Sequence, residues 1–336
     1  MNVLYSLIAV LVLLALAVVA GRYDGSRAAL AVSVPYGALF VFLAGICYRV
    51  VKWARSPVPF RIPTTCGQQK SLPWIKPATL DNPSTTGGVI GRMALEILLF
   101  RSLFRNNKAV LDGQRLVFGE HFLWLGAMAF HWSLLMIVLR HLRLVIEPVP
   151  AFVAALERMD GFFQLGTPRM YVSDVVVLVA LGYLLLRRLQ DPLVRYLSLF
   201  TDYFALFLLL SIAISGVLMR YFTRVDTVAI KQFALGLAGF APMALKPVGA
   251  VFFVHLLLVS ALAAYFPFSK LMHMGGVFLS PTRNLANNNR AHRHINPWNY
   301  PVHTHSYAEW ETEFRDKLVA AGLPVEADHA RTASAD

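Results

Sequence analysis

Apolar runs of about twenty residues recur along this chain, and they restrict its possible folds more than any other feature. About 20 apolar residues form a helix that is long enough to cross a bilayer, where every backbone group needs an internal partner. We predict six spans, at residues 2–20, 30–51, 118–139, 171–189, 198–219 and 248–270. Hydrophobic residues make up 57% of the chain and charged residues 15%, which also favours a membrane protein. The expected fold class is therefore all-α, a polytopic membrane protein with six transmembrane helices.

The predicted spans divide the chain into four regions. We expect an N-terminal transmembrane hairpin at 1–53, a cytoplasmic loop at 54–117, a four-helix core at 118–273 and a cytoplasmic tail at 274–336. Helical periodicity inside the loop predicts an amphipathic helix over residues 90–104. The first span lacks the basic start of a signal peptide, so we expect it to be retained.

The chain is basic, with a formal net charge of +12, and the positions of its cations predict its orientation. Cytoplasmic loops of membrane proteins collect Lys and Arg. With the amino terminus inside, the cytoplasmic segments hold 21 of the 31 Lys and Arg residues: eleven in 49–115, three in 187–195 and seven in 270–331. We therefore expect a multi-pass protein of the cytoplasmic (inner) membrane with both termini in the cytoplasm. The sequence has no basic stripe interleaved with aromatic residues, so nucleic acid is not an expected partner.

The chain has two cysteines, Cys47 and Cys66, which form neither a CxxC motif nor an iron–sulfur ligand spacing. Any iron–sulfur centre that works with this chain therefore has to come from a partner.

Four histidines lie in or beside two of the predicted spans: His121 and His131 in one, His255 and His273 in the other. An ionisable ring in lipid is costly, and by default it indicates function. Four imidazoles on two helices are the number needed to ligate two haem irons, each by one ring from each helix. These residues are the candidate ligands of two haems b.

Helix geometry pairs the four histidines across two antiparallel helices. Ten residues separate His121 from His131, about 15 Å along a helix, and eighteen separate His255 from His273, about 27 Å. The predicted topology places His121 beside His273 near the cytoplasmic face, and His131 beside His255 nearer the outer face. Because the two spacings differ, we expect a kink at Pro267, where the backbone loses a hydrogen bond.

Other functions remain open at this point. A proton-coupled transporter would also carry intramembrane histidines, although the sequence shows no broken helices in matching halves. A redox-inactive membrane anchor would give no reason for four buried histidines. We interpret His141 as an interfacial residue among basic anchors, with a quinone contact as the alternative. Arg140, Arg143 and Lys270 are candidates for haem propionates, or again for interfacial anchors.

The tail carries two alternating histidine pairs, His292 with His294 and His303 with His305. Such pairs bind zinc in other proteins, but no cysteine or carboxylate cluster completes a site here. A polar docking surface is the favoured interpretation. A helix is expected over residues 307–321.

The ten- and eighteen-residue histidine spacings, together with the segment PFSKLMH at 267–273, resemble the cytochrome b (gamma) subunit of respiratory nitrate reductase. The resemblance covers spans two to six, whereas the first span and the loop segment FRIPTTCGQQKSLPWIK at 60–76 are foreign to it. The loop and the Asn- and His-rich tail are more similar to the DsrM family. Its members are the dihaem membrane subunits of the Dsr complexes of sulfate reducers and sulfur oxidisers.

These resemblances imply a function in electron transport. They imply that His121 and His273 hold a cytoplasmic-side haem b, and that His131 and His255 hold an outer one. They also imply a quinone or quinol that reacts near the outer haem. The implied partner is a cytoplasmic iron–sulfur subunit of heterodisulfide-reductase (DsrK) type, with other subunits of a sulfur-metabolism complex.

Overall fold

A computed structural model describes residues 1–56, 67–105, 109–112, 115–118, 121–161, 169–242, 248–290, 292 and 301–326. Its contacts divide the chain into two units, Met1–Ala291 and His292–Asp336. The division comes later than the expected start of the tail at residue 274, because residues 281–290 pack against the loop that precedes the core. Cys66 and His294 lie outside the described residues.

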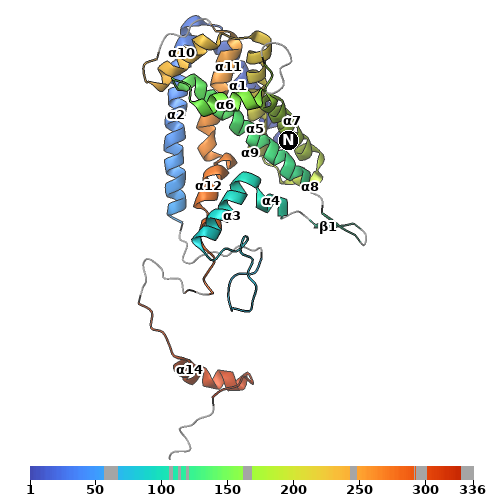
Figure 1. The fold of residues 1–336 in the computed structure, drawn as a ribbon, viewed down its shortest axis with the longest axis vertical. Coiled ribbons are helices and arrows are strands. Elements are labelled where there is room, and N and C mark those ends of the chain that lie inside the picture. Colours follow the sequence, from blue (N-terminus) through green and yellow to red (C-terminus); the bar gives the residue numbers. More distant parts are fainter. Residues whose placement is uncertain are drawn as a thin grey trace, which may run out of the picture. The chain divides into compact units, whose positions relative to one another are not determined.

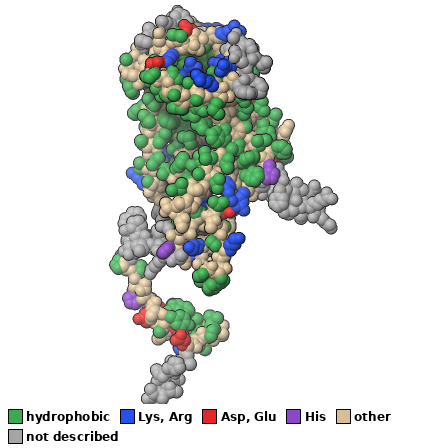
Figure 2. Space-filling model, in the orientation of Figure 1, with side chains coloured by type: hydrophobic (Ala, Val, Ile, Leu, Met, Phe, Trp, Pro, Cys, Tyr) green, Lys and Arg blue, Asp and Glu red, His purple; other side chains and the backbone are tan. Residues whose placement is uncertain are grey.

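The first unit is a bundle of long helices (Figure 1). They are α1 (Asn2–Ala20), α2 (Asp24–Ala54), α5 (His121–Val145), α7 (Val172–Gln190), α9 (Phe200–Val217) and α11 (Ala250–Tyr265). A π-helix, η1 (Leu218–Thr223), continues α9. Hydrophobic side chains cover the middle of the face in Figure 2, as a bundle that crosses a bilayer requires. The prediction of a polytopic, helical membrane protein is confirmed.

Among the described residues, five segments are long and apolar enough to cross a membrane: Asn2–Ala20, Ala29–Ala54, His121–Val145, Phe200–Thr223 and Ala250–Phe268. They correspond to five of the six predicted spans. The remaining predicted span, 171–189, is α7, which is 19 residues long and packs along α5 and α9. It differs from those five segments in carrying three charged residues, Asp174, Arg187 and Arg188, near its ends.

One end of the bundle, here called the α6 end, carries two further helices, α6 (Ala151–Asp160) and α10 (Thr227–Ala238) (Figure 1). The sequence had not predicted α10. Asp226 begins it as an N-cap, because its carboxylate accepts hydrogen bonds from the first backbone N–H groups of the helix. Ile230 and Phe233 then bury its apolar face in a core shared with α11.

The opposite end, here called the α3 end, is formed by α3 (Thr86–Leu99), α4 (Arg101–Arg105), α12 (His273–Leu279) and α13 (Pro281–Asn284) (Figure 1). The amphipathic helix predicted over 90–104 is therefore two helices that meet at Phe100. A two-stranded antiparallel hairpin, β1 (Ala109–Asp112) and β2 (Arg115–Phe118), adds a short sheet to the expected all-α fold. The short helix α8 (Pro192–Leu197) connects α7 to α9.

The loop before the core is tied to the segment after α12. The backbone N–H of Asn287 donates to the Pro83 carbonyl over 2.7 Å, and its side-chain amide donates to Asn82 Oδ1 over 2.6 Å. Arg92 is buried and donates to the Leu285 carbonyl over 3.2 Å. These contacts join two parts of the sequence that are about two hundred residues apart.

The predicted kink at Pro267 is confirmed, and it is a complete break. Helix α11 ends at Tyr265, and two 3₁₀ turns follow, η2 (Phe266–Phe268) and η3 (Lys270–Met272), before α12 begins at His273. Pro267 cannot donate the next helical hydrogen bond, so the chain tightens into turns there. As a result, His255 and His273 lie on different helices.

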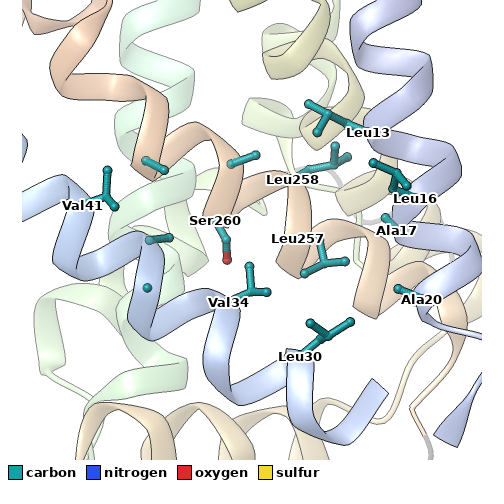
Figure 3. A pocket seen from close by; sticks show the side chains of 14 residues that line it. Leu13, Leu16, Ala17, Ala20, Leu30, Val34, Val41, Leu257, Leu258 and Ser260 are labelled. Carbon is teal, nitrogen blue, oxygen red and sulfur yellow. The ribbon is translucent and has the colours of Figure 1, made fainter. Parts of the chain in front are cut away.

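An apolar groove of about 430 Å³ lies between α1, α2 and α11 (Figure 3). Ser260 is the one lining residue with a polar side chain, and its hydroxyl is satisfied by the Leu256 carbonyl over 2.8 Å. The groove therefore presents apolar surface within the membrane-spanning part of the bundle.

The second unit contains α14 (Tyr307–Ala320), which confirms the helix predicted over 307–321. Ser306 and Glu309 form a capping box at its start. The rings of His303 and His305 lie 4.9 Å apart. Within the described parts of the chain, no three His, Cys, Asp or Glu side chains gather as a metal site.

Candidate functional site

His131 of α5 and His273 of α12 face each other. Their ring centres are 5.9 Å apart, with an angle of 83° between the ring planes. Two imidazoles bound to opposite sides of one metal ion, through bonds of about 2 Å, have ring centres about 6 Å apart. Either ring can rotate about the shared axis, so nearly perpendicular planes are compatible with this arrangement. The two rings could therefore hold one haem iron between them.

His141 of α5 and His255 of α11 lie near each other at the α6 end. His141 lies within electrostatic reach of His255. Their positions along the helices agree, because His141 lies in the last turns of α5 and His255 in the first turns of antiparallel α11. The two pairs thus lie at the two ends of the bundle core.

The Nδ1 atoms of three of these histidines are held by backbone carbonyls of the same segment. The acceptors are the carbonyls of Ala127 for His131 (2.8 Å), Ile137 for His141 (2.7 Å) and Lys270 for His273 (2.8 Å). A carbonyl accepts only from a protonated nitrogen, so each contact selects the tautomer whose Nε2 carries the lone pair. Metal-bound histidines typically show this arrangement.

His255 is held by a side chain as well as by a main-chain contact with Ile212. Its Nδ1 lies 2.9 Å from the hydroxyl of Ser215, which is buried in α9 and donates onward to the Ile212 carbonyl over 2.9 Å. The hydroxyl hydrogen is used in that second bond, so Ser215 accepts the proton of His255 Nδ1. The Nε2 of His255 is then available in the same way as in the other three rings.

The structure does not bring together the pairs expected from the sequence, His121 with His273 and His131 with His255. His121 is the exposed first residue of α5, and its ring contacts Phe104 at 5.0 Å. Ten residues, about 15 Å of helix, separate it from the His131–His273 pair.

Helix boundaries explain this difference. The predicted span ended at residue 139, which placed His141 at the membrane surface, whereas α5 continues to Val145. His121, His131 and His141 repeat at intervals of ten, so spacing alone does not choose between the first two and the last two. The position along the helix would have distinguished them. His141 lies about as far from the end of α5 as His255 lies from the start of α11.

A buried ion-pair cluster lies directly beside His141. The guanidinium of Arg140 is 3.0 Å from Asp160 and 2.6 Å from Asp174, and only 8% of Arg140 is exposed. Ser173 donates to Asp160 over 2.6 Å, and Tyr221 of the π-helix donates to Asp174 over 2.8 Å. The cluster therefore joins α5, α6, α7 and η1 at one point.

The cations that the sequence offered for haem propionates are already engaged. Arg140 pairs with the carboxylates just described, Arg143 pairs with Glu157 over 2.7 Å, and Lys270 pairs with Asp202 over 2.8 Å. Each neutralises a carboxylate of the chain itself, so the structure gives these residues another role.

Comparisons with known proteins show the family to which this chain belongs. The model of the nitrate reductase gamma subunit family matches residues 114–293, which include α5, α11 and α12 with both histidine pairs. A protein of Archaeoglobus fulgidus named Hdr-like menaquinol oxidoreductase cytochrome b-like subunit is 47% identical over 276 residues, covering 80% of this chain and 82% of the relative. A protein of the same name from Archaeoglobus profundus is 41% identical over 273 residues, covering 79% and 81%. This chain is a multi-pass membrane protein that belongs to the nitrate reductase gamma subunit family.

Proposed function

We propose that this chain is a dihaem membrane cytochrome b that exchanges electrons between membrane quinone and an iron–sulfur partner. The observation that carries the proposal is the contact between the His131 and His273 rings, with His141 and His255 near each other at a second depth of the bundle. The proposed ligand pairs are His131 with His273 and His141 with His255. Haem bound there would supply one-electron chemistry at both depths.

The chain's own residues position and tune these ligands. The Nδ1 contacts of His131, His141 and His273 fix each ring by its backbone, and the Ser215 hydroxyl fixes His255. Such contacts also raise the basicity of the coordinating nitrogen. His131 and His255 are partly buried among the apolar helices, whereas His141 and His273 are exposed at the surface of the bundle.

The substrates and partners are inferred from charge, cysteine content and the relatives. The names of both relatives include menaquinol, which supports a quinol as the membrane substrate. The basic α3 end is proposed to face the cytoplasm. The chain has only two cysteines, so an iron–sulfur subunit of heterodisulfide-reductase (DsrK) type is proposed as the electron partner there, in a Dsr-type sulfur-metabolism complex.

The decisive experiment counts haem in purified full-length protein and in single alanine variants. The wild type should show b-type bands and about two haems per chain. Removing His131, His141, His255 or His273 should each leave about one. His121→Ala is the matched control, because it removes a histidine of the same helix and should retain both.

Two outcomes would contradict the proposal. A folded, colourless wild-type protein would favour a transporter or an anchor. Loss of a haem in His121→Ala, with both retained in His141→Ala, would support the pairs expected from sequence spacing instead.

A further inference from the structure

Phe100 adopts a backbone conformation that bulky residues rarely take. It lies between α3 and α4 with φ 47° and ψ 46°, in the left-handed region. That region is unfavourable for any residue with a large side chain and persists only where the surroundings fix it. The cost of this conformation points to a role for the Phe100 ring.

The ring of Phe100 contacts the imidazole of His131. The ring centres are 4.9 Å apart and the planes meet at 84°, an edge-to-face arrangement. Phe100 is half-buried, so its ring shields the imidazole on that side. The residue that directly follows α3 and has a left-handed backbone is thus the one that contacts His131, a proposed ligand.

Two indoles of α5 hold the end of α3 in place. The Nε1 of Trp124 donates to the Leu99 carbonyl over 2.8 Å, and the Nε1 of Trp132 donates to the Leu98 carbonyl over 3.2 Å. The last carbonyls of a helix have no donor within the helix, so these bonds satisfy groups that would otherwise need water. Both indoles lie on the helix that carries His131.

Glu96 fixes the bend itself. Its carboxylate accepts the backbone N–H of Ser102 over 3.0 Å and pairs with Arg283 over 2.9 Å. The chain is therefore held on both sides of Phe100, by α5 on one side and by the α13 segment on the other. These contacts prevent the backbone at Phe100 from leaving the left-handed region.

We propose that Phe100 is a positioning residue for the haem site at the α3 end, where it fixes the orientation of the His131 imidazole and keeps water from it. This inference rests on the proposed function. Orientation of an axial ring and solvent exposure are both levers on the electronic structure and potential of a haem. Water beside the ring would stabilise the more highly charged ferric state, so loss of the Phe100 ring should lower the potential of one haem.

The test uses purified full-length protein and three variants. Phe100→Gly removes the ring and accepts the left-handed backbone, while Phe100→Tyr keeps an aromatic ring as the conservative rescue. Phe240→Gly is the matched control, because Phe240 is also left-handed, with φ 54°, but its ring stacks on Tyr36 of α2. Haem content, a redox titration and the electron paramagnetic resonance spectrum of the ferric haems are measured for each.

The expected result is two haems in every variant, with one altered low-spin signal and one lowered potential in Phe100→Gly only. The shift should be about tenfold in the reduction equilibrium, or about 59 mV for one electron. Loss of one haem in Phe100→Gly, with Phe100→Tyr like the wild type, would also support the inference. Unchanged signals in Phe100→Gly, equal shifts of both haems, or the same shift in Phe240→Gly would overturn it. A wild-type protein without haem would instead overturn the proposed function.

Discussion

The two ends of the bundle core hold their histidine pairs in different ways. At the α6 end, buried charges fix the helices around His141 and His255, with Arg140 between two carboxylates. At the α3 end, aromatic rings pack against His131, and the ion pairs of Asp81 with Arg101 and of Glu96 with Arg283 lie in the segments around the bend at Phe100. One fold can thus hold its histidines mainly by buried charge pairs at one end and mainly by aromatic packing at the other, and the two ends should fail under different conditions.

The largest effect is expected from breaking the charge cluster. Arg140→Met should destabilise the protein by about 3–5 kcal/mol, because Asp160 and Asp174 would remain buried without their cation. The measurement is thermal unfolding in detergent. Arg143→Met is the control, since Arg143 is 49% exposed and its pair with Glu157 should contribute at most about 1 kcal/mol. Equal losses in the two variants would remove the distinction between the two ends.

The next effect concerns the hydroxyl behind His255. Ser215→Ala removes the hydroxyl that contacts His255 Nδ1, and loss of such an outer contact typically weakens metal binding about 10–100-fold. One haem should therefore dissociate more readily during purification, and its potential should shift. Ser260→Ala is the control, because Ser260 is also a buried serine that bonds the main chain, without contact to a histidine. Full retention of both haems in Ser215→Ala would show that His255 needs no such support.

The α3 end should respond to acid through Asp81. Burial alone would raise the pKa of this carboxyl, but hydrogen bonds and charges from Arg101 and Arg105 hold its pKa below the ordinary value. A carboxyl with a lowered pKa stabilises the fold above its unfolded pKa of about 3.9, and this stabilisation is lost as the pH falls through the lowered value. Proteolysis of the loop should increase below about pH 4 in the wild type. Asp81→Asn should be susceptible already at neutral pH, with a cost of about 1 kcal/mol.

The smallest effect is expected at Lys270. It pairs with Asp202 over 2.8 Å, but the lysine side chain is 66% exposed. Lys270→Met should therefore cost less than about 1 kcal/mol, and the difference should vanish in high salt. The haem count should not change, because His273 uses the main-chain carbonyl of Lys270 and not its side chain. A lost haem in this variant would assign the ammonium group a direct role.

The elements that the sequence predicted are those governed by local rules. Apolar length predicted the long helices, and Pro267 predicted the break before His273, since each depends on residues within one segment. The candidate site could be predicted only in part from the sequence. His131, His255 and His273 stood out as intramembrane rings, whereas choosing between His121 and His141 required the true ends of α5.

Other features depend on contacts between distant segments. Nothing local distinguishes Phe100 within the apolar periodicity of residues 90–104, because its left-handed backbone is imposed by the indoles of α5 and by Arg283. Helix α10 was not predicted because the twelve residues that follow its Asp226 cap are a short segment of mixed polar and apolar residues.

The buried amide pair between Asn82 and Asn287 has a consequence for biogenesis. The two residues are 205 positions apart, and the interval contains every helix from α3 to α13. Neither side chain is more than 2% exposed, so each leaves a desolvated polar group if the other is missing. The loop that contains Asn82 therefore cannot form its contact with Asn287 until α5, α7, α9 and α11 have been synthesised. A chain truncated before residue 287 would contain the membrane helices but would lack the partner of Asn82 at the α3 end.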